Sequence, residues 1–206
     1  MTHSASRTDE IILTALQLAE DRGVSGVTTA TLARRLGFTE AALYRYFPGK
    51  GAILAAVLQH VAERIFVSMS TDLQPMEPSS PEDVERQLGR HIDEFTRHRG
   101  LALELLLAAA SGRDAALRES ASAFLHEYVQ RMETHFDQLR ESEKVWCAPG
   151  ADELARMWVC QLLGGFVRCR ISHDPWSPTG QPGFVSFVRY LTAGAAAQPV
   201  VSAVGG

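Results

Sequence analysis

Apolar residues in this chain recur every three to four positions in almost every segment, and no segment shows the sustained alternation typical of a half-buried strand. Each recurrence predicts a helix with one apolar face. The predicted fold class is therefore all-α, with about nine helices. These helices cover roughly residues 8–22, 28–36, 39–47, 50–71, 84–100, 101–110, 117–139, 154–169 and 184–191.

Residues that begin and end helices fall at the edges of these patterns. Thr28 and Thr39 are each suited to cap a short helix, and Gly37 ends the first of the two. Proline-rich stretches at 74–83 and 175–182 predict loops on either side of the middle helices. The last ten residues, 197–206, have no packing period and are expected to form a flexible tail.

Composition is that of a globular protein. The 206 residues are 46% hydrophobic, enough for a core of their own. Three cysteines do not make a disulfide framework, and the first residues lack the charge and apolar run of a signal peptide. No run approaches about 18 consecutive apolar residues. We therefore expect a cytoplasmic protein with no membrane segment.

The charge is unevenly distributed. The whole chain carries a net charge of −4, but residues 27–50 hold four basic residues against Glu40 alone. Residues 51–206 hold an excess of acidic side chains. A short basic block within an acidic chain indicates one localised surface that favours nucleic acid.

The basic block also has the pattern of a helix-turn-helix. Two short helices flank residues 36–38, and helices this short need packing partners. In the second helix Leu43 and Phe47 are four apart and point inward, so Ala41 and Arg45 lie on the opposite face. That outward face is suited to approach base-pair edges in the major groove.

The order Thr-Thr, Leu-Ala, Leu-Gly, Ala-Leu-Tyr, Tyr-Phe, Lys across residues 28–50 resembles the DNA-binding domain of the TetR family of bacterial transcriptional regulators. The resemblance implies a DNA-binding domain at 1–50 and a helical regulatory and dimerisation domain at 51–196. It also implies a homodimer on a palindromic DNA operator, since one recognition helix reads only a half-site.

Carried over residue by residue, the resemblance implies ten DNA-contacting positions. Thr28 and Thr29 suit a phosphate but also cap a helix, and Tyr44 and Tyr46 suit the DNA backbone or simple packing. Lys50 resembles a phosphate-contacting lysine, with a solvated side chain as the alternative. The ten positions are Thr28, Thr29, Thr39, Glu40, Ala41, Ala42, Tyr44, Arg45, Tyr46 and Lys50.

Base reading within this set has fewer candidates. Arg45 is suited to a bidentate contact with guanine, or alternatively to a phosphate. Ala41 and Ala42 either meet thymine methyl groups or are merely small enough to admit the helix. Glu40 either accepts from cytosine or favours the helix dipole in the first turn, and we favour the dipole.

The second half carries two further expectations. The resemblance places a dimer interface on the last two helices, and mid-helix glycines there suit a close crossing. The predicted interface residues are Leu162, Gly165, Phe166, Phe184, Phe187, Val188 and Leu191. A mostly apolar pocket for a small-molecule effector has as candidates His91, Phe95, Leu106, Phe124, Tyr128, Met132 and Trp158.

His91 and His98 are seven residues apart and on this basis share a helix face. A third ligand is lacking, so we predict no metal site, and no cofactor motif occurs. Common hydrolase, nucleotide and metalloprotease motifs are absent as well, and the chain is not expected to be an enzyme.

Two functions fit the resemblance. The first is a homodimeric repressor that leaves its operator when a small molecule binds. The alternative is a nucleoid-associated inhibitor of cell division with a TetR-like fold, which binds many chromosomal sites and a division protein. Residues 39–50, followed by a helix with Glu63 and Arg64, resemble that subgroup.

Overall fold

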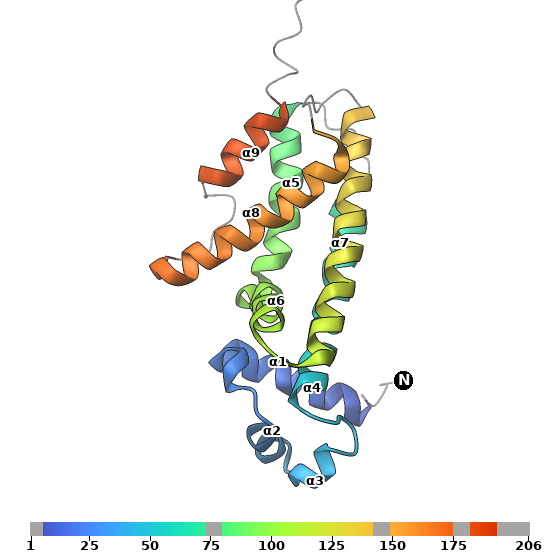
Figure 1. The fold of residues 1–206 in the computed structure, drawn as a ribbon, viewed down its shortest axis with the longest axis vertical. Helices are drawn as coiled ribbons and strands as arrows, with labels where there is room; N and C mark the ends of the chain where they lie inside the picture. The colour runs from blue at the N-terminus through green and yellow to red at the C-terminus, as the bar shows by residue number, and fades with distance from the viewer. Residues whose placement is uncertain (1–5, 73–79, 142–148, 175–181, 193–206) are drawn as a thin grey trace, which may run out of the picture. The chain divides into compact units, whose positions relative to one another are not determined.

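The computed structural model describes residues 6–72, 80–141, 149–174 and 182–192. Over these residues the chain forms nine α-helices, two short 3₁₀ segments (η) and no strand, which confirms the all-α prediction (Figure 1). The predicted tail at 197–206 lies outside the described residues. The elements are α1 Arg7–Arg22, η1 Val24–Gly26, α2 Thr29–Leu36, α3 Glu40–Leu43, α4 Lys50–Asp72, α5 Pro81–Thr96, η2 Arg97–Gly100, α6 Leu101–Ser111, α7 Ala115–Glu141, α8 Ala151–Ser172 and α9 Pro182–Thr192.

The contacts divide the chain into two units. Unit 1 comprises Met1–Ser70 and Asp93–Tyr128, and unit 2 comprises Thr71–Ile92 and Val129–Gly206. Helices α5 and α7 therefore each contribute one end to unit 1 and the other end to unit 2. The boundary predicted after residue 50 divides the chain by function rather than by contacts, because DNA binding is assigned to residues 1–50. This boundary remains a prediction.

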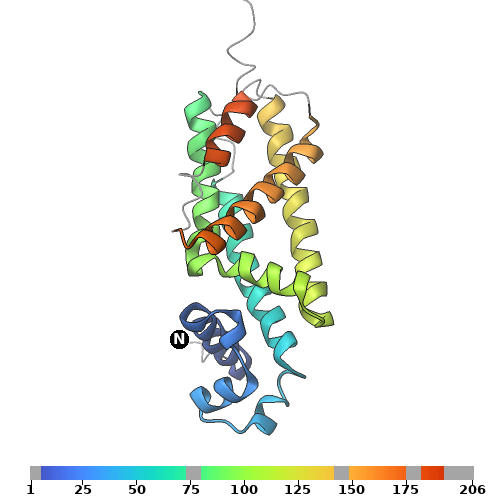
Figure 2. The ribbon, with the colours of Figure 1, turned by 60° about the vertical axis from the view of Figure 1, so that its left-hand side comes forward.

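The N-terminal helices of unit 1 begin and end where short-range chemistry directs them. Thr28 is the N-cap of α2, and its hydroxyl accepts a hydrogen bond from the Thr31 backbone N–H at 3.0 Å. Gly37 ends α2 at φ 69°, in the left-handed region that glycine adopts without strain. Figure 2 shows α1, α2 and α3 grouped beside the first turns of α4.

Helix α4 supplies the core of unit 1. Its apolar stripe includes Ile53, Val57, Leu58 and Ile65, each with no exposed surface. Of the described helices, α4 alone is long and apolar enough to cross a membrane by length and composition. The search for a run of about 18 consecutive apolar residues did not detect α4, because polar residues interrupt its sequence. Burial of the stripe within unit 1 accounts for the helix's apolar character.

The turn between α5 and α6 departs from the helix predicted to run to about residue 100. α5 ends at Thr96, and His98, Arg99 and Gly100 then take positive φ angles of 53°, 57° and 76°. Three successive left-handed residues break the helical register. The predicted shared face of His91 and His98 is therefore wrong, because the two residues do not lie on one helix.

Unit 2 has an aromatic core. The Trp158 ring lies 5.6 Å from that of Phe187 and 6.1 Å from that of Phe184, so α8 packs on α9. The Phe136 ring of α7 lies 6.4 Å from the Trp158 ring. Four large rings from three helices thus form the centre of this unit.

Candidate nucleic-acid interface

The interface is built around the first residues of α2 and α3. Thr29, the first residue of α2, donates its hydroxyl to a carboxylate oxygen of Glu40, the first residue of α3, at 2.7 Å. Glu40 therefore sits in the first turn of α3, as the helix-dipole interpretation predicts. The hydrogen bond also ties the two helices together at their N-terminal ends.

The recognition segment is shorter as a regular helix than predicted. Thr39 caps α3 by accepting from the Ala42 backbone N–H at 3.1 Å, but α3 itself covers only Glu40–Leu43. Beyond it, Arg45 and Tyr46 donate to carbonyls three residues back, and Phe47 donates to that of Leu43 at 3.1 Å. The segment thus continues in tighter turns to Phe47, so the backbone still presents a helical surface.

The faces of this segment are those that the spacing predicts. Leu43 and Phe47 are buried. Ala41 and Arg45 are exposed, and Tyr44 and Tyr46 expose 52% and 44% of their surface. Ala42 is intermediate. Exposed tyrosine hydroxyl groups beside an arginine are suited to contact a DNA backbone.

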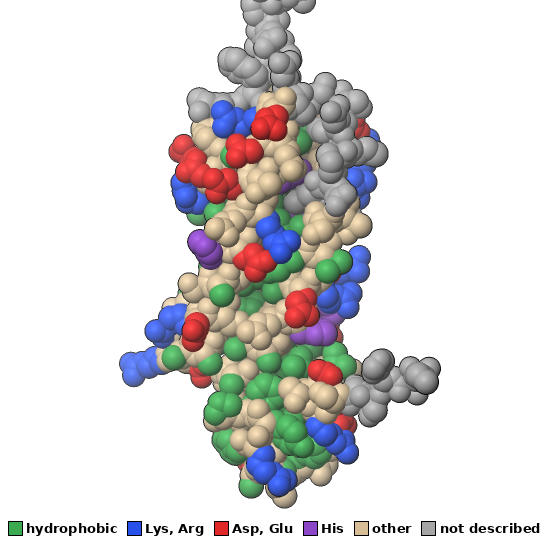
Figure 3. Space-filling model, turned by 90° about the vertical axis from the view of Figure 1, so that its right-hand side faces the viewer, with side chains coloured by type: hydrophobic (Ala, Val, Ile, Leu, Met, Phe, Trp, Pro, Cys, Tyr) green, Lys and Arg blue, Asp and Glu red, His purple; other side chains and the backbone are tan. Residues whose placement is uncertain are grey.

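Positive charge surrounds this surface. Arg34 and Arg45 are exposed, and neither forms an ion pair within the part of the chain that the structure describes. Arg35 pairs with Asp21 at 3.3 Å and is therefore less available. In Figure 3, Lys and Arg side chains lie among exposed hydrophobic side chains at the end of unit 1 that carries α2 and α3.

Lys50 differs from the other predicted contacts. It is half-buried at the start of α4, and burial lowers the pKa of its ammonium group. The Nζ atom donates to the Ser25 carbonyl of η1 at 3.5 Å, a long hydrogen bond. A weak bond of this kind leaves the ammonium group able to exchange partners.

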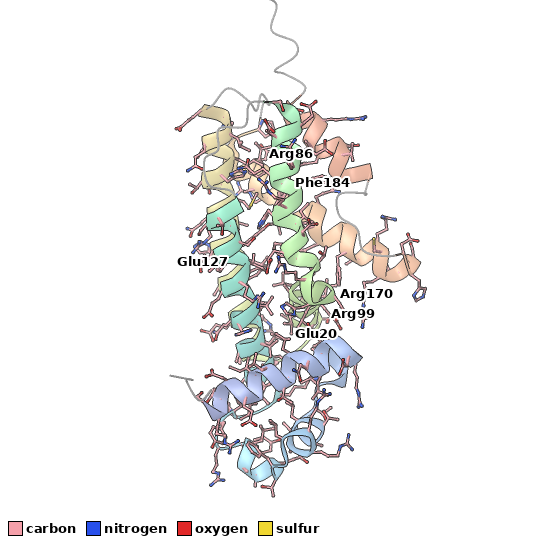
Figure 4. The ribbon with its side chains drawn as sticks, turned by 180° about the vertical axis from the view of Figure 1, so that it is seen from behind. Glu20, Arg86, Arg99, Glu127, Arg170 and Phe184 are labelled. Atoms are coloured by element: carbon pink, nitrogen blue, oxygen red, sulfur yellow. The ribbon has the colours of Figure 1, made fainter. Side chains whose placement is uncertain are left out.

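Polar contacts from α6 and the preceding turn hold the end of α1, and no motif or spacing in the sequence predicts them. Glu104 of α6 accepts from the Val24 backbone N–H of η1 at 2.9 Å. His98 donates to the Glu20 carboxylate, and Arg99 donates to the Glu20 carbonyl at 3.2 Å. Figure 4 shows Arg99 and Glu20 together at the end of α1. These bonds fix the position from which α2 and α3 start.

The structure separates the predicted effector-pocket residues between the two units. All seven are buried. In unit 1, Phe95, Phe124 and Tyr128 form an aromatic cluster with ring separations of 5.2–6.4 Å. Leu106 also belongs to unit 1, whereas His91, Met132 and Trp158 belong to unit 2. Their role in ligand binding remains a prediction.

The predicted dimer residues also lie within one chain's core. Six of the seven are buried, and Gly165 is intermediate. The exposed large apolar residues of α8 and α9 are instead Met157, Ile171 and Tyr190, with Ile171 exposing 74% of its surface. The interface remains a prediction, and these three exposed side chains are further candidates for it.

Comparison with known proteins places this geometry in a family. The model of the bacterial regulatory proteins, tetR family, matches residues 11–57, which contain α2, α3 and the start of α4. A nucleoid occlusion factor SlmA from Marinobacter nauticus is 35% identical over 184 residues, covering 84% of this chain and 89% of that protein. The chain belongs to the TetR family. A second SlmA, from Aliivibrio fischeri, is 29% identical over 179 residues with the same coverage.

Solved TetR-family structures share the fold. A TetR-family transcriptional regulator from Marinobacter aquaeolei has a TM-score of 0.69 and 20% identity, covering 91% of this chain and 92% of its own. SmeT, the repressor of the Stenotrophomonas maltophilia multidrug efflux pump SmeDEF, has a TM-score of 0.67 and 17% identity, covering 92% and 90%. At these identities the likeness concerns the TetR fold alone.

Proposed function

We propose that this protein is a nucleoid occlusion factor: a DNA-binding protein of the TetR family that binds many chromosomal sites and a cell-division protein. The observation that carries the proposal is similarity to SlmA proteins across 84% of the chain, well beyond the 11–57 segment common to the family. Nucleoid occlusion is thus the second of the two functions that the sequence suggested. The proposed function is not enzymatic.

The exposed face of residues 40–47 supports the DNA-binding part of the proposal. In this proposal, Arg45 reads a base or contacts phosphate. Tyr44 and Tyr46 contact the DNA backbone with their hydroxyl groups. Thr28 and Thr29 contact a phosphate at the start of α2. The protein acts as a homodimer on a palindromic double-stranded DNA site, in the cytoplasm and on the nucleoid. The DNA-binding domain corresponds to residues 1–50, and residues 51–196 form the dimerisation domain.

A ligand-released repressor is the second candidate. The observation that favours it is His135 of unit 2, which is buried and has no hydrogen-bond partner at either ring nitrogen among the described residues. A buried imidazole of this kind suits a polar group of a small-molecule effector. In that case the protein would leave a single operator when the effector binds.

The distribution of binding sites distinguishes the two candidates. The purified protein is mixed with fragmented genomic DNA at physiological salt, and the retained fragments are sequenced, because affinity for DNA depends strongly on salt. Nucleoid occlusion predicts many palindromic sites spread over the chromosome, together with blocked division when the protein is overproduced. One or two sites beside a neighbouring gene, with normal division, would support the repressor instead.

Matched variants test whether the exposed face of residues 40–47 is responsible for DNA binding. Arg45→Ala removes the proposed base contact, and Arg140→Ala removes an exposed arginine at the end of α7. We expect Arg45→Ala to weaken specific binding by about 5- to 150-fold, the range for losing one bidentate contact. Arg140→Ala should bind as the wild type does. Equal binding by both variants would contradict the proposed interface.

A further inference from the structure

A cavity of about 480 Å³ lies within unit 1, between η1, the first turns of α4, helix α6 and the start of α7. Its volume is in the range of small-molecule sites. None of the seven predicted effector-pocket residues lines it. Its lining includes the apolar side chains of Leu54, Leu107 and Leu117, together with three charged side chains.

The cavity contains one cationic group. Lys50 lines it, and this ammonium group has as its protein partner the Ser25 carbonyl at 3.5 Å. Lys50 forms no ion pair with any described carboxylate. Burial disfavours its charged form, which lowers its pKa. A ligand carboxylate would stabilise the ammonium group where the protein itself supplies only a long hydrogen bond.

Two carboxylates line the same cavity. Glu104 accepts from the Val24 backbone N–H at 2.9 Å, and Asp114 accepts from that of Leu117 at 3.1 Å. These bonds hold both side chains in place, and a carboxylate has further lone pairs to offer. The Asp114 carboxylate also lies against the backbone of Gly51, where a Cβ atom would come within 1.8 Å of it. The absent side chain of Gly51 leaves room for Asp114 at the cavity wall.

We propose that this cavity binds a small zwitterion, an α-amino acid with an apolar side chain. Its carboxylate pairs with Lys50, its ammonium group pairs with Asp114, and its side chain packs on Leu54, Leu107 and Leu117. The lining carries charge of both signs, so a ligand with one charged group meets a like charge, whereas a zwitterion pairs each of its groups with an opposite charge.

Binding in the cavity has a consequence for DNA that rests on the proposed function. Lys50 is the first residue of α4 and a predicted phosphate contact. A ligand carboxylate that pairs with Lys50 competes with phosphate for the same ammonium group. The amino acid therefore weakens DNA binding.

Calorimetric titration of the full chain tests the ligand class. The probes are L-leucine, N-acetyl-L-leucine, which lacks the ammonium group, and isoamylamine, which lacks the carboxylate. We expect L-leucine to bind and each analogue to bind at least about tenfold more weakly, since each loses a charged hydrogen bond. Absence of binding to L-leucine at millimolar concentration would overturn the proposal. Equal binding of isoamylamine would also overturn it, in favour of a site for cations.

Variants locate the site. Asp114→Asn keeps a side chain able to cap α7 but removes the charge, and Gly51→Ala places a methyl group where the Asp114 carboxylate lies. Both should weaken L-leucine binding at least about tenfold. Glu119→Gln, at an exposed position of α7 outside the cavity, is the matched control and should bind normally. Wild-type affinity in both cavity variants, with folding verified by circular dichroism, would overturn the assignment.

A DNA-binding assay with and without L-leucine separates the inference from the function on which it rests. Saturating L-leucine should weaken DNA binding severalfold in the wild type and not in Lys50→Met. If L-leucine binds but DNA affinity is unchanged, the coupling through Lys50 is wrong. Failure to bind DNA even without L-leucine would instead contradict the proposed function.

Discussion

Mild acid should destabilise the protein through two buried histidines. His91 of α5 and His135 of α7 both belong to unit 2 and are buried. Burial, together with positive charge on His135, lowers the pKa of His91 to about 3. Burial lowers the pKa of His135 to about 4. The folded chain therefore holds both imidazoles neutral.

The sign and size of the effect follow from these values. Above the ordinary pKa of 6.5, both histidines are neutral in the folded and unfolded chain and contribute nothing. Below it, the unfolded chain takes up protons that the folded chain does not, so stability falls until the folded pKa values are reached. Between about pH 7.5 and 5.5, each histidine should lower the free energy of unfolding by about 1.4 kcal/mol, or about 3 kcal/mol together.

Urea unfolding followed by circular dichroism measures this difference. The wild type is compared at the two pH values with the double variant His91→Leu/His135→Leu and with His126→Gln, which alters an exposed histidine of α7. The double variant should lose most of the pH dependence, and His126→Gln should keep it. A wild-type loss below about 1 kcal/mol, or an unchanged loss in the double variant, would refute the reasoning.

Three substitutions in the DNA-binding segment test its packing and caps. Leu43→Ala removes a fully buried side chain and should lower the free energy of unfolding by about 2–5 kcal/mol, whereas Leu13→Ala, at a partly exposed position, should cost much less. Chemical denaturation of the two proteins side by side checks this. Thr39→Ala removes the α3 cap and should cost about 1 kcal/mol, while Thr39→Ser should be nearly neutral in the same assay. Gly37→Ala forces a Cβ atom into a left-handed residue and should lower the melting temperature more than Gly37→Asn does.

Local chemistry explains what the sequence predicted well. Thr28, Thr39 and Gly37 cap or end helices through contacts with residues three or four positions away, and each lies where the sequence placed it. The inward pair Leu43 and Phe47 is likewise confirmed, because helical spacing alone separates it from the outward residues. Such features are encoded within a single helical turn.

Long-range polar contacts were not predictable in this way. Glu104 and the Val24 N–H are 80 residues apart, and His98 and Glu20 are 78 apart. No spacing rule connects such residues. The left-handed turn at His98 and Arg99 was also missed, because neither residue is the glycine or asparagine that usually marks such a turn.

The apolar residues of α8 and α9 show a further limit. Phe166, Phe184 and Leu191 were predicted at a dimer interface because the family resemblance places that interface on the last two helices. They belong to the apolar faces with which α8 and α9 pack within their own chain, and all three are buried there. Periodicity identifies an apolar face, but it does not say whether that face meets the same chain or a partner. The exposed Met157 and Ile171 lie on a second stripe of α8, with Cys160, Gly164 and Val167 between them at spacings of three and four residues.

The division of unit 1 into two stretches of sequence affects how the protein is made. Residues up to Ser70 leave the ribosome first, but the rest of their unit ends only at Tyr128. At about 5–20 residues per second, the later stretch is completed about 3–12 s after the earlier one. During this delay the apolar stripe of α4 lacks α6 and the first part of α7. Nascent α4 therefore exposes its apolar stripe during this interval, which makes it a segment that a chaperone would bind.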